Sequence, residues 1–100
     1  MNLSVLKRVT IISEALSEER LLADLKRLGA RGYTLTEVRG EGSRGVRASE
    51  WEGNNIKIET LVSATIATAI LEFLAERYFP SYAVVAHQEE VDVVRGEKYI

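Results

Sequence analysis

The segment RGEGSRGVRASEWEGNN, residues 39–55, concentrates glycine, hydroxyl and guanidinium groups in a short stretch of chain. Gly40, Gly42 and Gly45 have the G-x-G-x-x-G spacing of a dinucleotide-binding loop. Such a loop binds pyrophosphate only when a helix follows it, because the free amides at the helix N-terminus hold the phosphates. Here the sequence G-N-N at residues 53–55 leads into a strand-like run instead. The spacing therefore does not predict a Rossmann-type site.

The same segment carries side chains that suit an anion. Ser43 offers a hydroxyl group, and Arg44 and Arg47 offer two guanidinium groups three residues apart. In a flat strand these arginines would point to opposite faces, whereas a turn built on glycine lets both reach one anion. Each charge-assisted hydrogen bond that is shielded from water contributes about 1.5–3 kcal/mol. The alternative is a surface hairpin whose arginines pair with the neighbouring acids Glu41, Glu50 and Glu52.

Strands and helices that would hold this segment are indicated on both sides of it. The run SVLKRVTIIS is rich in β-branched residues, and leucines at helical spacing follow between a potential cap at Ser17 and a stop at Gly29. After the glycine-rich segment, a run of alternating polarity precedes a helix capped by Ser63 or Thr65 and stopped by Pro80. The predicted strands are residues 4–13, 33–38, 55–62, 82–88 and a short 90–94, and the predicted helices lie between 17 and 29 and between 63 and 80, before a polar tail.

This order of elements predicts a ferredoxin-like α+β fold (βαββαβ), in which two helices cover one face of an antiparallel sheet. Two helices leave the second face uncovered. The apolar residues alternate between the faces, with Val9, Ile11, Val84 and Ala86 on one and Ile12, Ala83 and Val85 on the other. An exposed apolar sheet face favours association, so we expect an oligomer.

Length and composition restrict the class of protein. One hundred residues, 46% of them hydrophobic, fit a single domain over residues 1–100. A net charge of −2 argues against a protein that binds nucleic acid, and the lack of cysteine excludes disulfide bonds and a thiolate nucleophile. No apolar run has the length of a signal peptide or a membrane span, so we expect a cytoplasmic protein.

Other candidate sites have less support in the residues. His87 is the only histidine and has no cysteine near it, so no metal site is predicted. No nucleophile or general base accompanies Arg44 and Arg47, so no catalytic residue is predicted. A small phosphoryl- or acyl-phosphate-processing enzyme of ferredoxin-like fold is the alternative. Trp51, the only tryptophan, lies in a polar stretch and is either a packing anchor or a contact for a partner.

The chain resembles the PII-like signalling proteins, and specifically the cyanobacterial carbon-sensing SbtB family. The resemblance extends from about Lys7 to Val94 and rests on the stretches GARGYTLTEVRGEGSRGVR, NNIKIETLV and RYFPSYAVVA. Its most specific part is G-x-G-S-R-x-V-R at residues 40–47, between the second and third predicted strands. The resemblance implies a PII-like homotrimer with adenine-nucleotide sites in the clefts between subunits.

The resemblance also implies roles for individual residues. It implies a regulatory T-loop at about residues 40–54 that contacts the sodium-dependent bicarbonate transporter SbtA through Glu50, Trp51 and Glu52. The protein would then be cytoplasmic, and peripherally membrane-associated when bound to the transporter. The implied effector is cAMP, AMP, ADP or ATP, with an optional divalent metal for ATP. The residues implied to bind the nucleotide are Thr34, Gly40, Gly42, Ser43, Arg44, Arg47, Tyr82, Ala83 and Val84.

The sequence departs from the family pattern in three places. The family usually has glycine where this chain has Val84, so the approach of the backbone to a ligand differs there. Many members carry a C-terminal extension with cysteine, whereas this chain ends in RGEKYI, so redox control is not implied. The loop between Arg47 and Asn55 is also several residues shorter than the family pattern leads us to expect.

Overall fold

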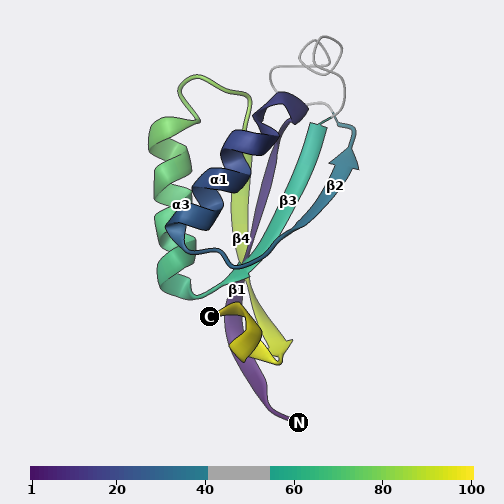
Figure 1. The fold of residues 1–100 in the computed structure, drawn as a ribbon, viewed down its shortest axis with the longest axis vertical. Coiled ribbons are helices and arrows are strands. Elements are labelled where there is room, and N and C mark those ends of the chain that lie inside the picture. The colour runs from purple at the N-terminus through teal and green to yellow at the C-terminus, as the bar shows by residue number, and fades with distance from the viewer. Residues whose placement is uncertain (41–54) are drawn as a thin grey trace.

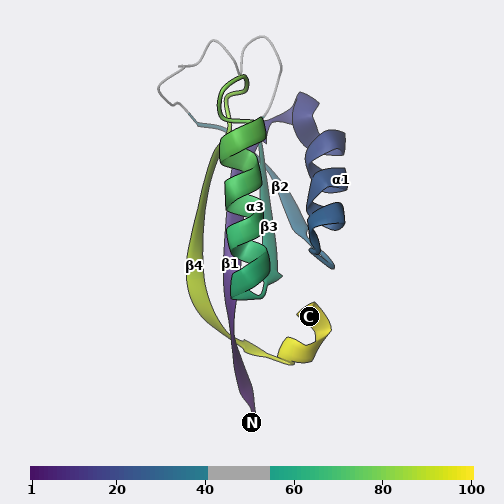
Figure 2. The same ribbon diagram turned by 90° about the vertical axis from the view of Figure 1, so that its left-hand side faces the viewer.

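The computed structural model describes residues 1–40 and 55–100. The elements are β1 (Leu3–Glu14), η1 (Ala15–Ser17), α1 (Glu18–Leu28), β2 (Thr34–Val38), β3 (Asn55–Val62), α3 (Ala64–Arg77), β4 (Val85–Val94) and η2 (Gly96–Tyr99). One antiparallel sheet has the strand order β2-β3-β1-β4, and both α-helices cover the same face of it (Figures 1 and 2). This arrangement confirms the predicted ferredoxin-like fold.

The centre of the sheet is formed by β1 and β3. Ile11 of β1 lies opposite Ile58 of β3 and Ala86 of β4. Along β3 every second residue is buried and the residues between them are half-buried. A strand with one face packed on helices and the other face open has this alternation. The third predicted strand is therefore confirmed together with the orientation of its side chains.

The hydrophobic core lies between the sheet and the two helices. Ile11 and Ile58 from the strands form one fully buried cluster with Leu21 of α1 and Ile70 of α3. Removal of such side chains from water supplies about 25 cal/mol per Å² of apolar surface, which makes this layer the main source of stability. The residues predicted to face the helices all contact this core: Val9, Ile11, Val84 and Ala86.

The helix ends follow the predictions with one exception. Ser17 does not cap α1 through its side chain, because the 3-10 turn η1 runs directly into the helix and holds Ser17 at helical backbone angles (φ −86°, ψ −1°). Ser63 does cap α3, since its Oγ accepts a hydrogen bond from the Ile66 amide at 3.3 Å. Gly29 ends α1 with a φ of +117°, the left-handed conformation that favours glycine.

The end of the chain differs from the prediction of two strands. A single strand, β4, pairs with β1 from Val85 to Val94 without a break in the register. The predicted gap between two strands at residue 89 therefore does not occur. The segment Tyr82–Val84 precedes this strand and forms a turn, in which the Val84 amide donates to the Tyr82 carbonyl oxygen at 3.0 Å. The polar tail forms η2, whose first residue packs closely against Ser4.

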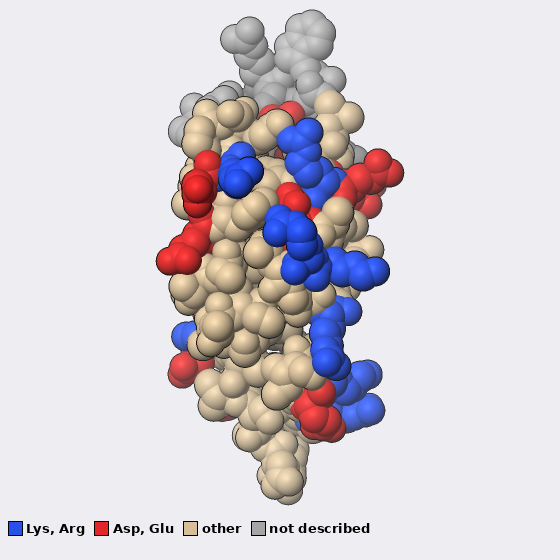
Figure 3. Space-filling model, turned by 60° about the vertical axis from the view of Figure 1, so that its left-hand side comes forward, with Lys and Arg blue, Asp and Glu red and all other residues tan. Residues whose placement is uncertain are grey.

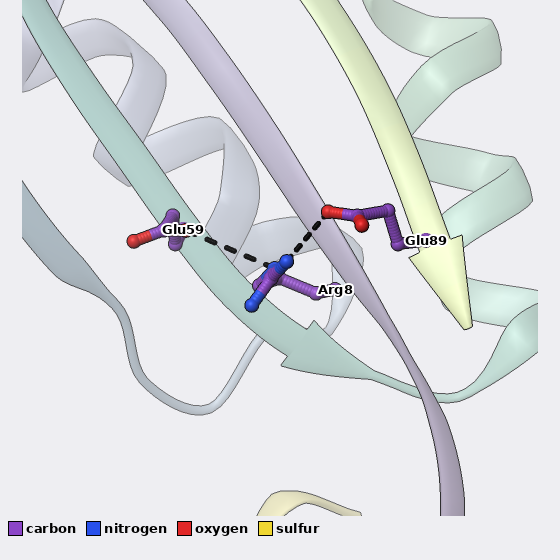
Figure 4. Close-up of polar contacts among 3 residues, drawn as sticks. All are labelled: Arg8, Glu59 and Glu89. Atoms are coloured by element: carbon purple, nitrogen blue, oxygen red, sulfur yellow. Dashed lines mark hydrogen bonds and ion pairs between the residues drawn. The ribbon is translucent and has the colours of Figure 1, made fainter. Parts of the chain in front are cut away.

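The open face of the sheet, which is turned away from the helices, was predicted to be apolar, but charged side chains lie at its centre. Arg8 of β1 lies between Glu89 of β4 and Glu59 of β3 (Figure 4). Its Nη2 is 2.5 Å from Glu89 Oε1, and its Nε is 3.8 Å from Glu59 Oε2. The hydrogen bond and charge of Glu89 raise the pKa of Arg8, and Arg8 in turn lowers the pKa of Glu89. Long charged side chains pair across the strands here, whereas Leu61, opposite Arg8, is apolar, and so, further along, are Ile12 and Val85 as expected.

Candidate functional site

The predicted site residues divide into two groups. Thr34, Gly40, Tyr82, Ala83 and Val84 belong to the part of the chain that the structure describes. The remaining residues lie outside the described residues: Gly42, Ser43, Arg44, Arg47, Glu50, Trp51 and Glu52. The geometry of the first group therefore decides what the described part of the chain offers to a ligand.

Gly40 and the segment Tyr82–Val84 lie at the same end of the sheet but at opposite edges. Gly40 follows β2. The last residue of β2 pairs with the first residue of β3, and this first residue of β3 also pairs with the last residue of β1. Tyr82–Val84 leads into β4, whose first residue pairs with Ile12, two residues from the same end of β1. Because β3 and β1 separate the edges, three spacings of about 4.8 Å put them about 14 Å apart.

Thr34 lies even further from Tyr82–Val84. It is the exposed first residue of β2 and pairs with Glu59 on the open face. Residues that are paired across the strands form rows, and the row of Thr34 lies two residues along the sheet from the row of Val85. That offset adds about 7 Å along the sheet to the separation of about 14 Å across it. The backbone of one chain thus does not bring Thr34 and the α3–β4 connection together.

Gly40 does not need to be glycine for the conformation of its own backbone. Among the described residues, Gly29 is the glycine with a positive φ, so the expected left-handed backbone is not present at Gly40. A Cβ atom added at Gly40 would meet no described heavy atom within 4 Å. With respect to the described residues, the position is therefore open on its side-chain side, which leaves space for a ligand to approach the backbone.

The segment Tyr82–Val84 is held firmly at both of its ends. The Tyr82 amide donates to the Tyr78 carbonyl oxygen at 2.8 Å, and the side chain of Val84 is buried in the core. Ala83 between them is half-buried. These three residues were predicted as strand positions, and this is wrong because the turn bonds replace pairing with β1. Their backbone forms a short, ordered rim at the β4 edge of the sheet.

Residues of α1 contact this rim and were missed in the sequence. Arg20 donates a hydrogen bond to the Tyr82 hydroxyl group, and Asp24 accepts one from the Tyr78 hydroxyl at 2.6 Å. The bond to Tyr82 is the main cause of the raised pKa of Arg20. Burial, and then the hydrogen bond to Asp24, raise the pKa of Tyr78 well above its ordinary value. In the sequence, the spacing of Arg20 and Asp24 by one helical turn was the feature that could have indicated a shared polar face of the helix.

A second feature is an open groove of about 890 Å³ at the C-terminal end of α1. It is lined mainly by the last turns of the helix, which include Lys26, and by the connection to β2, which includes Arg31 and Tyr33. The connection is held by buried Thr60, whose hydroxyl donates to the Gly32 carbonyl oxygen at 2.6 Å. Exposed cations gather along the α1 side of the molecule (Figure 3). None of the predicted site residues within the described ranges lines this groove.

Metal binding and membrane insertion have no support within residues 1–40 and 55–100. No group of three histidine, cysteine, aspartate or glutamate side chains in these two ranges is arranged to hold a metal ion. No helix in the same ranges is long and apolar enough to cross a membrane. His87 lies exposed on the open face of the sheet, opposite Thr10.

Comparison with protein families gives one match that covers nearly the whole chain. The family model described as nitrogen regulatory protein P-II matches residues 6–98. The match includes β1 except for its first residues, both α-helices, and the candidate residues at both edges of the sheet.

Solved structures give similar folds over the full length. A PII-like signalling protein from Thermus thermophilus is 59% identical, with 100% of both chains covered and a TM-score of 0.88. CPII from Thiomonas intermedia, bound to ADP and bicarbonate, is 27% identical, with 99% of this chain and 98% of that chain covered and a TM-score of 0.87. A second structure of CPII, bound to ADP, AMP and bicarbonate, is 27% identical over 98% of this chain and 96% of that chain, with a TM-score of 0.85.

Proposed function

The chain belongs to the nitrogen regulatory protein P-II family and is a PII-like signalling protein, and we propose that it senses adenine nucleotides and regulates bicarbonate transport. The observation that carries the proposal is the full-length similarity to CPII, a protein that binds ADP, AMP and bicarbonate. ADP and AMP are therefore the first candidates for the effector, ahead of cAMP and ATP. A signalling role without catalysis fits both the family and the residues of the candidate site.

The proposed site lies between two copies of the chain in a homotrimer. The separation of about 14 Å between the β2 and β4 edges supports this arrangement, because Thr34 and Tyr82–Val84 of one chain are far apart. In a ring of identical subunits, the β2 edge of one copy can meet the β4 edge of the next, since such interfaces join different patches. Thr34 and Tyr82–Val84 would then come from neighbouring subunits.

The glycine-rich segment supplies the charge that the proposed site requires. Arg44 and Arg47 would hold the phosphate groups, with the Ser43 hydroxyl beside them. Gly40 and Gly42 would let the backbone pass close to the ligand, and the open space beside Gly40 supports this role. No general base in this set is available to activate the Ser43 hydroxyl, so the site would bind without reaction.

The proposed output is contact with a bicarbonate transporter of the SbtA type. Residues 40–54 would form the T-loop, and Glu50, Trp51 and Glu52 would touch the transporter from its cytoplasmic side. The nucleotide changes the affinity for the transporter only if it binds the two loop conformations with different affinities. The bicarbonate in the CPII structures supports a link to inorganic carbon.

Calorimetric titration with cAMP, AMP, ADP and ATP, each with and without Mg²⁺ and bicarbonate, tests the proposal. We expect micromolar binding of ADP or AMP and a loss of about tenfold or more in Arg47→Ala, because one charge-assisted hydrogen bond contributes about 1.5–3 kcal/mol. Lys26→Ala removes the same charge from exposed α1 and serves as the matched control. Absence of binding by all four nucleotides would refute the nucleotide sensor, and equal affinity in the two variants would remove Arg47 from the site.

A further inference from the structure

The contacts between α1 and the α3–β4 connection form a side-chain network that the proposed function does not explain. Arg20 donates to the Tyr82 hydroxyl, and its guanidinium carbon lies 5.3 Å from the centre of the Tyr82 ring. One helical turn later, Asp24 accepts a hydrogen bond from Tyr78 at 2.6 Å. Residues four apart lie on the same side of a helix, so a single face of α1 holds both tyrosines.

The two tyrosines have different roles in this network. Tyr78 is 2% exposed and belongs to the core, whereas Tyr82 is 36% exposed. Their rings lie with centres 5.5 Å apart and planes tilted by 45°, a favourable arrangement of aromatic rings. Tyr78 is therefore the fixed member, and the exposed Tyr82 depends on the ring of Tyr78 and on Arg20 for its position.

The backbone transmits the position of Tyr82 to the rest of the rim. The Tyr82 amide is bonded to the Tyr78 carbonyl oxygen at 2.8 Å, and the Tyr82 carbonyl oxygen accepts from the Val84 amide at 3.0 Å. A displacement of Tyr82 therefore changes the backbone at Ala83 and Val84 as well. The side chains of Tyr78 and Val84 are both buried in the core. The part of the connection that can move is therefore the stretch between these two residues, which includes Tyr82.

We propose that Arg20 and Asp24 are positioning residues that hold Tyr82–Val84 in the conformation that binds the nucleotide. This inference rests on the proposed function, in which Tyr82–Val84 contributes to the site. It makes α1 a determinant of nucleotide affinity although neither of its two side chains needs to touch the ligand. Residues that act only on each other and on a shared segment are coupled, so their substitutions are not additive.

A double-mutant cycle with Arg20→Gln and Tyr82→Phe measures this coupling, with ADP as the probe. Each single variant is expected to weaken ADP binding about fivefold, and the double variant to bind within about twofold of either single one. Lys26→Gln removes a charge from the same helix without a described contact to the connection, and should bind ADP as the wild type does. Additive losses would mean that the two side chains act on the ligand independently, and unchanged affinity would mean that they do not position the site. Either result overturns the inference.

Amide hydrogen exchange in the nucleotide-free protein tests the same inference without any ligand. The amides of Tyr82 and Val84 should exchange faster in Arg20→Gln and in Asp24→Asn than in the wild type, while core amides of β1 keep their protection. If the wild type binds no nucleotide but these rates rise, the proposed function fails and the positioning role stands. If ADP binds and these rates stay unchanged, the positioning role fails and the proposed function stands.

Discussion

The two faces of the sheet carry different kinds of side chain. The covered face carries Ile11 and Ile58, both fully buried beneath α1 and α3. The open face carries Arg8 at its centre, between two glutamates from neighbouring strands (Figure 4). Burial of apolar side chains stabilises the chain strongly, whereas exposed ion pairs contribute little to folding. We conclude that the covered face determines the fold, and we propose that the open face takes part in the association of copies.

The largest expected effect is on the covered face. Ile58→Ala should lower the free energy of unfolding by about 2–5 kcal/mol, because it removes buried methyl groups and leaves a cavity. The control is Leu16→Ala, a truncation of an aliphatic side chain that is 75% exposed, which should leave stability nearly unchanged. Urea unfolding followed by circular dichroism measures both. Equal losses in the two variants would contradict the assignment of the core to this face.

The open face is tested by reversal of its central charge. Arg8→Glu would place three carboxylates together, and we expect the folded chain to persist while the proposed homotrimer of about 34 kDa, three times the 11.2 kDa chain, dissociates at micromolar concentration. Lys26→Glu makes the same change of charge on exposed α1 and should remain trimeric. Size exclusion with light scattering gives the mass, and circular dichroism confirms the fold. Loss of the trimer in both variants, or in neither, would show that the open face does not control assembly.

A smaller effect is expected for the hydrogen bond between Tyr78 and Asp24 on the helix side. Tyr78→Phe should lower the free energy of unfolding by about 1 kcal/mol at neutral pH. The folded state raises the pKa of Tyr78, so its contribution is complete below the unfolded pKa of about 10 and is lost as the pH rises above it. The stabilities of wild type and variant should therefore converge above pH of about 10.

Urea unfolding between pH 7 and alkaline pH measures this convergence. Tyr33 is 55% exposed, so Tyr33→Phe serves as the control and should match the wild type at neutral pH. A constant difference between wild type and Tyr78→Phe across the whole range would show that Tyr78 ionises equally well in the folded and unfolded states.

Most of the fold could be predicted from periodicity and from helix ends. Alternation along β3 and the caps at Ser63 and Gly29 indicated the right elements, because local chemistry determines them. The errors have two causes. The single strand β4 depends on continuous pairing with β1, which is far away in the sequence. Ser17 lost its capping role to the adjacent turn η1, of which it is the last residue, so that error is a local one.

The candidate site could be predicted only in part. The resemblance led to Tyr82–Val84, and their backbone does form an ordered rim next to β4. Arg20 was missed because its partner Tyr82 lies 62 residues away, and only the tertiary fold brings them together. Likewise, the separation of Thr34 from Tyr82–Val84 follows from strand order and register, which a sequence pattern does not contain.

The central claim, that two neighbouring subunits build each nucleotide site, is tested most directly by mixing two defective variants. Thr34→Glu and Ala83→Glu should each bind ADP poorly while circular dichroism shows a folded chain, because each repels phosphate from one side of the site. Unfolded together in urea and refolded at equal amounts, they should form mixed trimers in which about a quarter of the sites combine an intact Thr34 with an intact Ala83. Calorimetry should then find wild-type ADP affinity at about that fraction of sites. Mixed trimers that bind no better than the separate variants would contradict a site shared between subunits.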